Sequence, residues 1–431
     1  MKKLFLLLSL FLGAHSAWAH DAEVDGIFYN LFKGSQCAMV TFQGEEYNSV
    51  QNEYKGDVVV PATFTFDGVV YSVTGVEGHS FRDCTELTSV TLPNSVKSIG
   101  AECFRYCSSL TTVKLSNSLL SLEEYCFSDC PSLASIDIPN SVVDIERNCF
   151  SGCKALTSIA LPDSVKTLEW STFGGCTSLT SVALPDSLKM IASSCFNGCE
   201  SLPSIVLPDS LETIEWSVFE NCKKLKSISI PSSVKSIGTG CFQWCEAIDS
   251  MAVEKGNAFY DSREGCNAII ETATNTLIAG CMKTKIPDTV VTLADNCFKG
   301  CANLISITIP ASVSYLGGSC FNDCVNLSDF HIRRMTPPEA SSAWQGIFGW
   351  YCNSLEVIYV PKGTKELYES AYPWAAYKIV EEDTESGITP VVNDGKTAPV
   401  YHLGGSRVGT TENFNALPKG IYVVGGKKVL R

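Results

Sequence analysis

The chain repeats one pattern of apolar and polar positions every 23 residues over most of its length. The unit reads C-F-x-x-C-x-x-L-x-x-[IV]-x-[LI]-P-x-S-[VL]-x-x-[IL], and only Ser116 replaces the proline in the first run. Eight consecutive repeats are marked by Phe81, Phe104, Phe127, Phe150, Phe173, Phe196, Phe219 and Phe242. The pattern returns at Phe298 and Phe321, and a degenerate copy at residues 348–361 brings the total to about eleven coils.

Each part of the unit predicts a structural element. In residues 87–92, Val90 and Leu92 alternate with Ser89 and Thr91, which indicates a short strand with one buried face. The proline that follows ends the strand, because proline cannot donate to a ladder. Apolar groups at helical spacing in residues 103–110 predict a helical or 3-10 turn. Stacked coils would place each strand about 4.8 Å from the next in a parallel sheet.

This string resembles the BspA-like (treponemal-type) leucine-rich repeat of surface and secreted proteins of Bacteroidetes. The resemblance covers residues 75–380 and implies a leucine-rich-repeat solenoid of short parallel β-strands and helical turns. Families of this kind are often linked to adhesion to host proteins such as fibronectin or fibrinogen. The resemblance therefore implies an exported adhesin or interaction protein whose partner is an extracellular or host-matrix protein.

The N-terminal segments predict export and a capped solenoid. Residues 1–19 have the features of a signal peptide: two lysines, an apolar run and an Ala-Trp-Ala cleavage site before His20. Residues 20–74 read as a β-rich cap, with Asp67-Gly68 as a hairpin turn. No segment of the mature chain is long and apolar enough to span a membrane. We therefore expect an extracellular or outer-surface location.

Later segments depart from the repeat. A β-hairpin insertion is expected at about residues 248–285, where residues 268–271 and 276–279 pair around Thr274-Asn275. Residues 381–399 read as an acidic linker, and residues 400–431 as a small β tail with Gly425-Gly426 as its tight turn. The tail is similar to the C-terminal tails of secreted Bacteroidetes proteins, some of which are sorting signals.

Charge and motif content narrow the function. The formal net charge is −14, and an acidic surface repels phosphate backbones, so nucleic acid is not an expected partner. The five histidines are scattered, and the sequence contains no P-loop, nucleophile elbow or H-E-x-x-H motif. We therefore expect no enzyme, no catalytic residue and no cofactor.

The 21 cysteines favour a packing role. In seven repeats two cysteines stand four residues apart, which is not the C-x-x-C spacing of zinc or redox motifs. Several repeats lack the first cysteine, so the pattern predicts a ladder of small buried side chains. Disulfides between coils are the alternative, and four cysteines outside the ladder are better placed for them: Cys37, Cys266, Cys281 and Cys352.

A row of small hydroxyl residues is predicted on the outward face of the strands. We call it the hydroxyl strip; its members are Ser89, Thr112, Ser135, Ser158, Ser181, Ser204, Ser227 and Ser306. Small side chains leave a smooth surface that suits an extended partner, so these residues are the candidate ligand surface. The alternative is that short side chains only permit tight curvature of the sheet.

An acidic row has a structural and a functional interpretation. Asp163, Asp186 and Asp209 share one turn position, where stacked carboxylates could hold Ca²⁺. Each aspartate could equally cap its own turn, and this simpler interpretation leads us to expect no metal site.

The aromatic residues outside the phenylalanine ladder are open to two interpretations as well. Trp170 and Trp216 recur two coils apart, Trp244 lies in a later repeat, and a further cluster spans residues 344–374. We expect most of these rings to cover the core. If the tryptophans instead line up exposed on one face, they favour a glycan-binding protein of a polysaccharide-use system. A structural surface-layer component is a third possibility.

Overall fold

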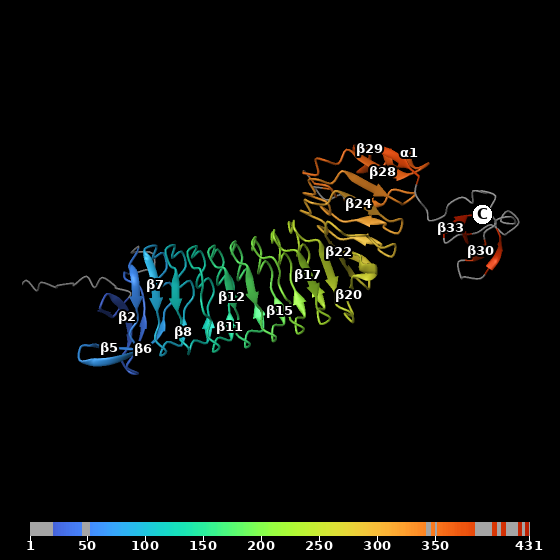
Figure 1. Ribbon diagram of the computed structural model, residues 1–431. Coiled ribbons are helices and arrows are strands. Elements are labelled where there is room, and N and C mark those ends of the chain that lie inside the picture. Colours follow the sequence, from blue (N-terminus) through green and yellow to red (C-terminus); the bar gives the residue numbers. More distant parts are fainter. Residues whose placement is uncertain are drawn as a thin grey trace, which may run out of the picture.

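The computed structural model describes residues 20–44, 52–341, 346–349 and 351–383, together with four strands within residues 399–430. The repeats wind into a parallel-strand solenoid of about 13 turns with few helices, close to the expected number of coils (Figure 1). The predicted signal peptide, residues 384–398 of the predicted linker, Gly425-Gly426, Trp344 and Trp350 lie outside the described residues.

The longer strands of successive coils form one side of the solenoid. They begin beside the cap and continue to the last turn: β4 (Gly56–Val59), β7 (Leu87–Thr91), β9 (Thr112–Lys114), β12 (Ser158–Ala160), β14 (Ser181–Ala183), β17 (Ser227–Ile230), β19 (Ser250–Val253), β24 (Ser306–Ile309), β26 (Asp329–Ile332), β28 (Val357–Pro361) and β29 (Lys378–Glu382). Their pairing is parallel and in register at one repeat per step, as Ser158 opposite Ser181 shows. We call the outward surface of these strands the strand face.

Two-residue strands form a second side, which follows the proline corner of each coil. They are β8 (Ser98–Ile99), β10 (Ser121–Leu122), β11 (Asp144–Ile145), β13 (Thr167–Leu168), β15 (Met190–Ile191), β16 (Thr213–Ile214), β18 (Ser236–Ile237), β23 (Thr292–Leu293), β25 (Tyr315–Leu316) and β27 (Glu339–Ala340). Their second residue points inward in almost every coil, because strand side chains alternate between faces.

The N-terminal segment covers the open end of the solenoid with a mixed sheet. Its strands are β1 (Ala22–Val24), β2 (Ile27–Phe32), β3 (Cys37–Val40), β5 (Thr63–Phe66) and β6 (Val69–Val76). Within it, β3 and β6 pair in parallel and the other neighbours are antiparallel. The expected hairpin between β5 and β6 is confirmed, and both Asp67 and Gly68 adopt the positive φ of a type I′ turn. Strand β6 also pairs in parallel with β8, so the cap continues directly into the short-strand side.

The C-F-x-x-C corners contain separate turns closed by i→i+3 hydrogen bonds, as in a 3-10 turn, and no continuous helix. The Cys107 amide donates to the Phe104 carbonyl at 3.2 Å, which closes one turn. Glu102 and Tyr106, two residues before and after Phe104, have φ values of 56° and 65°. Left-handed residues on both sides prevent a helix from continuing. The helices of the described residues lie elsewhere: η1 (Arg263–Gly265), α1 (Lys365–Glu369) and η2 (Trp374–Ala376).

The core is a stack of phenylalanine rings that runs along the solenoid axis. From Phe81 to Phe242, neighbouring ring centroids lie 4.9–5.7 Å apart and the rings are within 12° of parallel. Tyr54 of the cap starts the stack, 4.6 Å from Phe81. At the other end, Trp374 is fully buried beside Phe330 and Phe348. The repeat thus buries one large ring per coil.

The serine of the P-x-S segment links each coil to the one before it. The hydroxyls of Ser141, Ser210 and Ser233 each donate at 2.6 Å to a backbone carbonyl of the preceding coil. Ser164 and Ser187 make the equivalent bond. A repeated small hydroxyl therefore satisfies corner carbonyls that the short strands leave without a ladder partner.

The solenoid axis turns where the repeat is interrupted (Figure 1). The expected hairpin is confirmed: β21 (Ala268–Glu271) pairs antiparallel with β22 (Thr276–Gly280), and β20 (Tyr260–Asp261) extends it. The corner side skips this insertion, because the Trp244 amide donates directly to the Lys299 carbonyl at 3.1 Å. The additional strands β20, β21 and β22 lie on one side of the solenoid only, so they separate the coils on that side and the solenoid axis turns.

The C-terminal segment contains a separate small sheet. Its strands are β30 (Pro399–His402), β31 (Arg407–Thr410), β32 (Ile421–Val424) and β33 (Lys427–Leu430), and all its pairs are antiparallel. Among the described residues, no helix is long and apolar enough to cross a membrane.

Candidate functional site

The alternation of the strands puts the hydroxyl strip on the outside. In β12, Ile159 is buried while Ser158 and Ala160 are exposed, and β9 and β17 follow the same alternation. Seven of the eight strip residues are exposed. Ser89 is half-buried, because its hydroxyl donates to Asp57 Oδ1 of the cap at 2.6 Å. The strip thus lies on the outward side of the strands, with a cleft at Ser306 separating this residue from the other seven, and its role as a ligand surface stays a prediction.

In the middle of the strand face, the outward strand positions of three consecutive coils carry no charge. Their outward positions form what we call the central patch: Thr157, Ser158, Ala160, Thr180, Ser181, Ala183, Pro203, Ser204 and Val206. Val206 is 83% exposed although it is apolar. Lys114 and Asp137 precede the patch, and Lys226 follows it. In a chain of net charge −14, this neutral and smooth area differs from its surroundings.

All 21 cysteines are free thiols, 19 of them buried and two half-buried. Cys37, Cys266, Cys281 and Cys352 therefore form no bridges either. In eight corners the second cysteine donates its Sγ hydrogen to the phenylalanine carbonyl of the preceding coil, at 2.9 Å for Cys107 and 3.2 Å for Cys176. Burial raises the pKa of the Cys176 thiol to about 12, so the thiolate that metal binding and redox chemistry need is suppressed.

The acidic turn row lies on the surface of the solenoid. Asp163, Asp186 and Asp209 are exposed, and no group of three histidine, cysteine or acidic side chains within the described residues could hold an ion. In an earlier repeat, Asn94 Oδ1 accepts from the Asn117 amide of the next coil at 3.1 Å.

The expectation that the extra aromatic rings cover the core is wrong for two tryptophans. Trp170 is 42% and Trp216 is 54% exposed, at the same register position two coils apart. Gly238 permits the next coil to approach, since an added Cβ would lie 2.4 Å from the Trp216 nitrogen. Trp244 has a structural role instead: its Nε1 donates to Asp323 at 3.1 Å, and Lys299 lies 4.5 Å from its ring.

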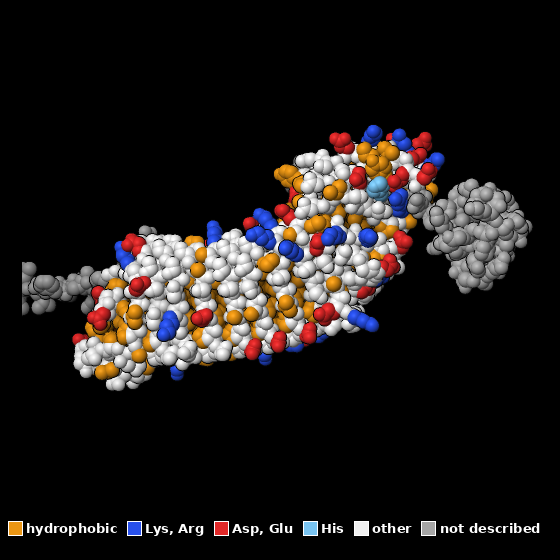
Figure 2. Space-filling model, in the orientation of Figure 1, with side chains coloured by type: hydrophobic (Ala, Val, Ile, Leu, Met, Phe, Trp, Pro, Cys, Tyr) orange, Lys and Arg blue, Asp and Glu red, His pale blue; other side chains and the backbone are white. Residues whose placement is uncertain are grey.

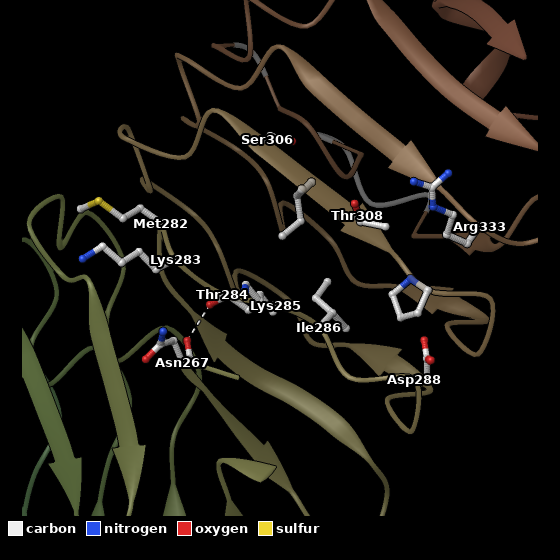
Figure 3. Close-up of a pocket in the computed structure, with 12 residues that line it drawn as sticks. Asn267, Met282, Lys283, Thr284, Lys285, Ile286, Asp288, Ser306, Thr308 and Arg333 are labelled. Carbon is white, nitrogen blue, oxygen red and sulfur yellow. Dashed lines mark hydrogen bonds between the residues drawn. The ribbon is translucent and has the colours of Figure 1, made fainter. Parts of the chain in front are cut away.

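A cleft at the turn of the solenoid was not expected from the sequence. It encloses about 630 Å³ between the segment 282–288 and the outward side of β24 (Figure 3). Its lining includes Lys283, Lys285 and Arg333. Figure 2 shows lysine and arginine side chains gathered where the two parts of the solenoid meet. We call this feature the junction cleft.

The register of the junction cleft was readable from the sequence. Residues 286–290 repeat the apolar-Pro-x-hydroxyl-Val string of the coils, so Lys283 and Lys285 precede Ser306 and Thr308 by one 23-residue interval. Two lysines therefore fall at the repeat positions of Ser306 and Thr308, and Lys285 shares its position with Lys114 and Asp137 of earlier coils. The exposure of Trp170 had no such signal, because a short repeat does not fix the direction of a corner side chain.

Comparisons with known proteins agree with this architecture. The family model for the BspA type leucine rich repeat region matches in six copies, over residues 74–185, 166–264 and 275–375. The fold is similar to a leucine rich cell surface protein from Faecalibacterium prausnitzii, with 24% identity, a TM-score of 0.55, and coverage of 85% of this chain and 95% of that one. A leucine-rich repeat protein from Bacteroides ovatus gives 22% identity, a TM-score of 0.55, and coverage of 84% and 100%. No curated protein sequence matches this chain.

Proposed function

The chain belongs to the BspA-type leucine-rich repeat family, and we propose that it is an exported surface protein that binds another protein through its strand face. Leucine-rich-repeat solenoids are typically non-catalytic, and their extended sheets serve as binding surfaces. The name of the Faecalibacterium relative, a cell surface protein, supports a surface location. A signal peptide at residues 1–19 would deliver the chain there.

The central patch is the observation that carries this proposal. Its nine positions combine short hydroxyl and apolar side chains, among them the exposed Val206, and they contain no charge. The cores of protein interfaces are depleted in charged residues, because a buried unpaired charge is costly. Short side chains also lose little conformational entropy when a partner covers them. A protein partner therefore fits this area better than a charged polymer does.

Binding to immobilised fibronectin and fibrinogen tests the proposal. We expect the purified protein to bind at least one of them, and we expect Ser181→Arg to weaken that binding at least tenfold, because a long cation enters the neutral patch. Ser236→Arg is the matched control, since Ser236 is an equally small exposed residue on the short-strand side. Retention by neither protein, or equal binding by both variants, would argue against the proposal.

A glycan-binding function is the second candidate, and the exposure of Trp170 and Trp216 favours it. The centroid distances from Phe173 to Phe196 and from Phe196 to Phe219 add to about 11 Å, which is the spacing along the stack of equivalent residues two coils apart. Trp170 and Trp216 are two coils apart in the same way. In the coil between them, the equivalent residue is Ser193, which is buried. Its amide and hydroxyl donate to the Glu215 carboxylate at 2.9 and 2.6 Å. Two exposed rings in one row could each stack on a sugar of an extended chain.

Affinity electrophoresis in gels containing dextran or xylan separates the two candidates. Retardation that disappears in the Trp170→Ala and Trp216→Ala variants, but persists in Ser181→Arg, would support glycan binding. Unchanged migration of the wild-type protein in both polysaccharides would leave protein binding as the function.

A further inference from the structure

One edge of β24 faces the junction cleft. On one side, β24 pairs with β26, and the Ile305 and Ile309 carbonyls accept from the Asp329 and Arg333 amides at 3.1 and 2.9 Å. Alternate residues of a strand direct their amides and carbonyls to opposite neighbours. The backbone groups of Ser306 and Thr308 therefore point away from β26 and toward the cleft.

Within the part of the chain that the structure describes, no strand pairs with this edge. The segment 282–286 has the register of the missing neighbour, but within the described residues neither Ser306 nor Thr308 shares a backbone hydrogen bond with it. The Lys285 amide is instead bonded to the Cys266 carbonyl at 2.9 Å, which holds the segment against the insertion. An open row of strand donors and acceptors is a template for pairing with another chain.

The ladder is also irregular at residues 135–137 and 204–206, which lie outside regular strands. Neither segment lines a described cavity, whereas Ser306, Ile307 and Thr308 line the junction cleft. The edge of β24 is thus the break in the ladder that has room beside it.

The walls of the cleft supply an apolar contact as well. Ile286 lines the cleft and is half-buried, as are the equivalent Ile138 and Leu184 of other coils. Figure 3 shows Ile286 and Thr284 on one side of the cleft and Thr308 on the other. An inserted strand could therefore bury an apolar side chain against Ile286.

The charge of the lining selects the partner. Lys283, Lys285 and Arg333 face one acidic lining residue, Asp288. Lys283 pairs with Asp249 at 2.6 Å and Arg333 with Glu382 at 2.7 Å. Lys285 is exposed and forms no ion pair with any described residue. A cationic rim in a chain of net charge −14 favours an acidic ligand.

We propose that the junction cleft binds an extended acidic peptide segment of a partner protein, which adds to the edge of β24 as a strand. Main-chain hydrogen bonds to Ser306 and Thr308 would provide the affinity, as in other cases of strand addition. Acidic side chains facing Lys283 and Lys285 would provide the selectivity. This inference rests on the proposed function and deepens it by naming the chemistry of the partner segment.

Fluorescence anisotropy with labelled seven-residue peptides tests the inference on the full chain. A peptide of alternating valine and glutamate should bind at least tenfold more tightly than one of alternating valine and lysine. The same acidic peptide, N-methylated at alternate residues, should lose at least tenfold in affinity, because it cannot donate to the β24 carbonyls. If the methylated and unmethylated acidic peptides bind equally, or if heparin displaces both to the same extent, the cleft is a general anion site and the inference is overturned.

Variants of the protein complete the test. Lys285→Glu should weaken the acidic peptide at least tenfold, whereas Lys166→Glu, an exposed lysine on the short-strand side, should not. Thr308→Pro removes the amide that faces the cleft and should also abolish binding, with circular dichroism confirming that the variant is folded. Full affinity in both Lys285→Glu and folded Thr308→Pro would overturn the inference.

Binding to fibronectin and fibrinogen is measured in parallel. Loss of matrix-protein binding in Ser181→Arg with intact peptide binding tests the strand face separately. Failure of the peptides together with retained matrix-protein binding overturns the cleft alone, and the proposed function stands.

Discussion

Removal of one ring from the phenylalanine stack should destabilise the solenoid locally and strongly. Phe150 is fully buried, and its ring centroid lies 5.5 Å from Phe127 and 5.6 Å from Phe173, in near-parallel contact with both. A buried Phe→Ala substitution costs roughly 3–5 kcal/mol, because transfer energy and a cavity add together. Phe150→Ala should therefore destabilise the surrounding coils by about that amount. Phe150→Leu keeps most of the volume and should cost roughly 1–1.5 kcal/mol.

Native-state hydrogen exchange measures this effect coil by coil. The Phe127 and Phe173 amides donate to the Cys149 and Cys195 carbonyls of their next coils at 2.8 and 2.9 Å, so both report opening near Phe150. Because each coil of a solenoid contacts mainly its neighbours, their opening free energies should fall while that of Phe321 does not. Phe259→Ala is the control, since its side chain is 47% exposed and its loss should change stability by less than about 0.5 kcal/mol.

The reasoning would be refuted by a Phe150→Ala variant whose exchange near Phe127 and Phe173 matches that of Phe259→Ala. It would be refuted equally by a loss of protection spread evenly over all coils.

Two further properties of the fold can be tested with little effort. The buried thiols should not react with Ellman's reagent at pH 8 until urea unfolds the chain, because burial raises their pKa, to about 12 for Cys176 and Cys222; rapid labelling of most of the 21 cysteines in the native protein would contradict the buried ladder. Burial also raises the pKa of the Glu53 carboxyl in the cap from 4.5 to about 7, so the native state holds a proton that the unfolded state releases. Stability should therefore fall as the pH rises from about 4.5 to 7, and Glu53→Gln should flatten this part of the Tm–pH curve; identical curves for the two proteins would show that Glu53 does not titrate in this way.

The sequence predicts what depends on the repeat itself. Because Val90 and Leu92 alternate with Ser89 and Thr91, the pattern identifies which side of each strand is buried, and the 23-residue interval places equivalent residues in one row. The same logic correctly assigns the cysteines to the core. The two hairpins are readable as well, since Asp67-Gly68 and Thr274-Asn275 favour tight turns.

The remaining features depend on backbone geometry that the repeat does not encode. The corners contain left-handed residues as different as Glu102, Tyr106 and Gly152, so apolar spacing alone suggests a helix that the φ angles exclude. The hydrogen bond from the Cys107 thiol to the Phe81 carbonyl joins adjacent coils, and the residue spacing within one repeat cannot predict it. The junction cleft arises because the insertion displaces residues 282–286 from β24, which is a consequence of packing.

The central claim is that the strand face contacts a protein partner, and site-specific photocrosslinking tests it most directly. The photoreactive residue p-benzoylphenylalanine is placed either at Ser181 in the central patch or at Ser236 on the short-strand side, both of which are exposed. Illumination in the presence of fibronectin or fibrinogen should crosslink the Ser181 position and leave the Ser236 position unreacted. Crosslinks from Ser236 alone, or from neither position when binding is saturated, would contradict the assignment of the strand face.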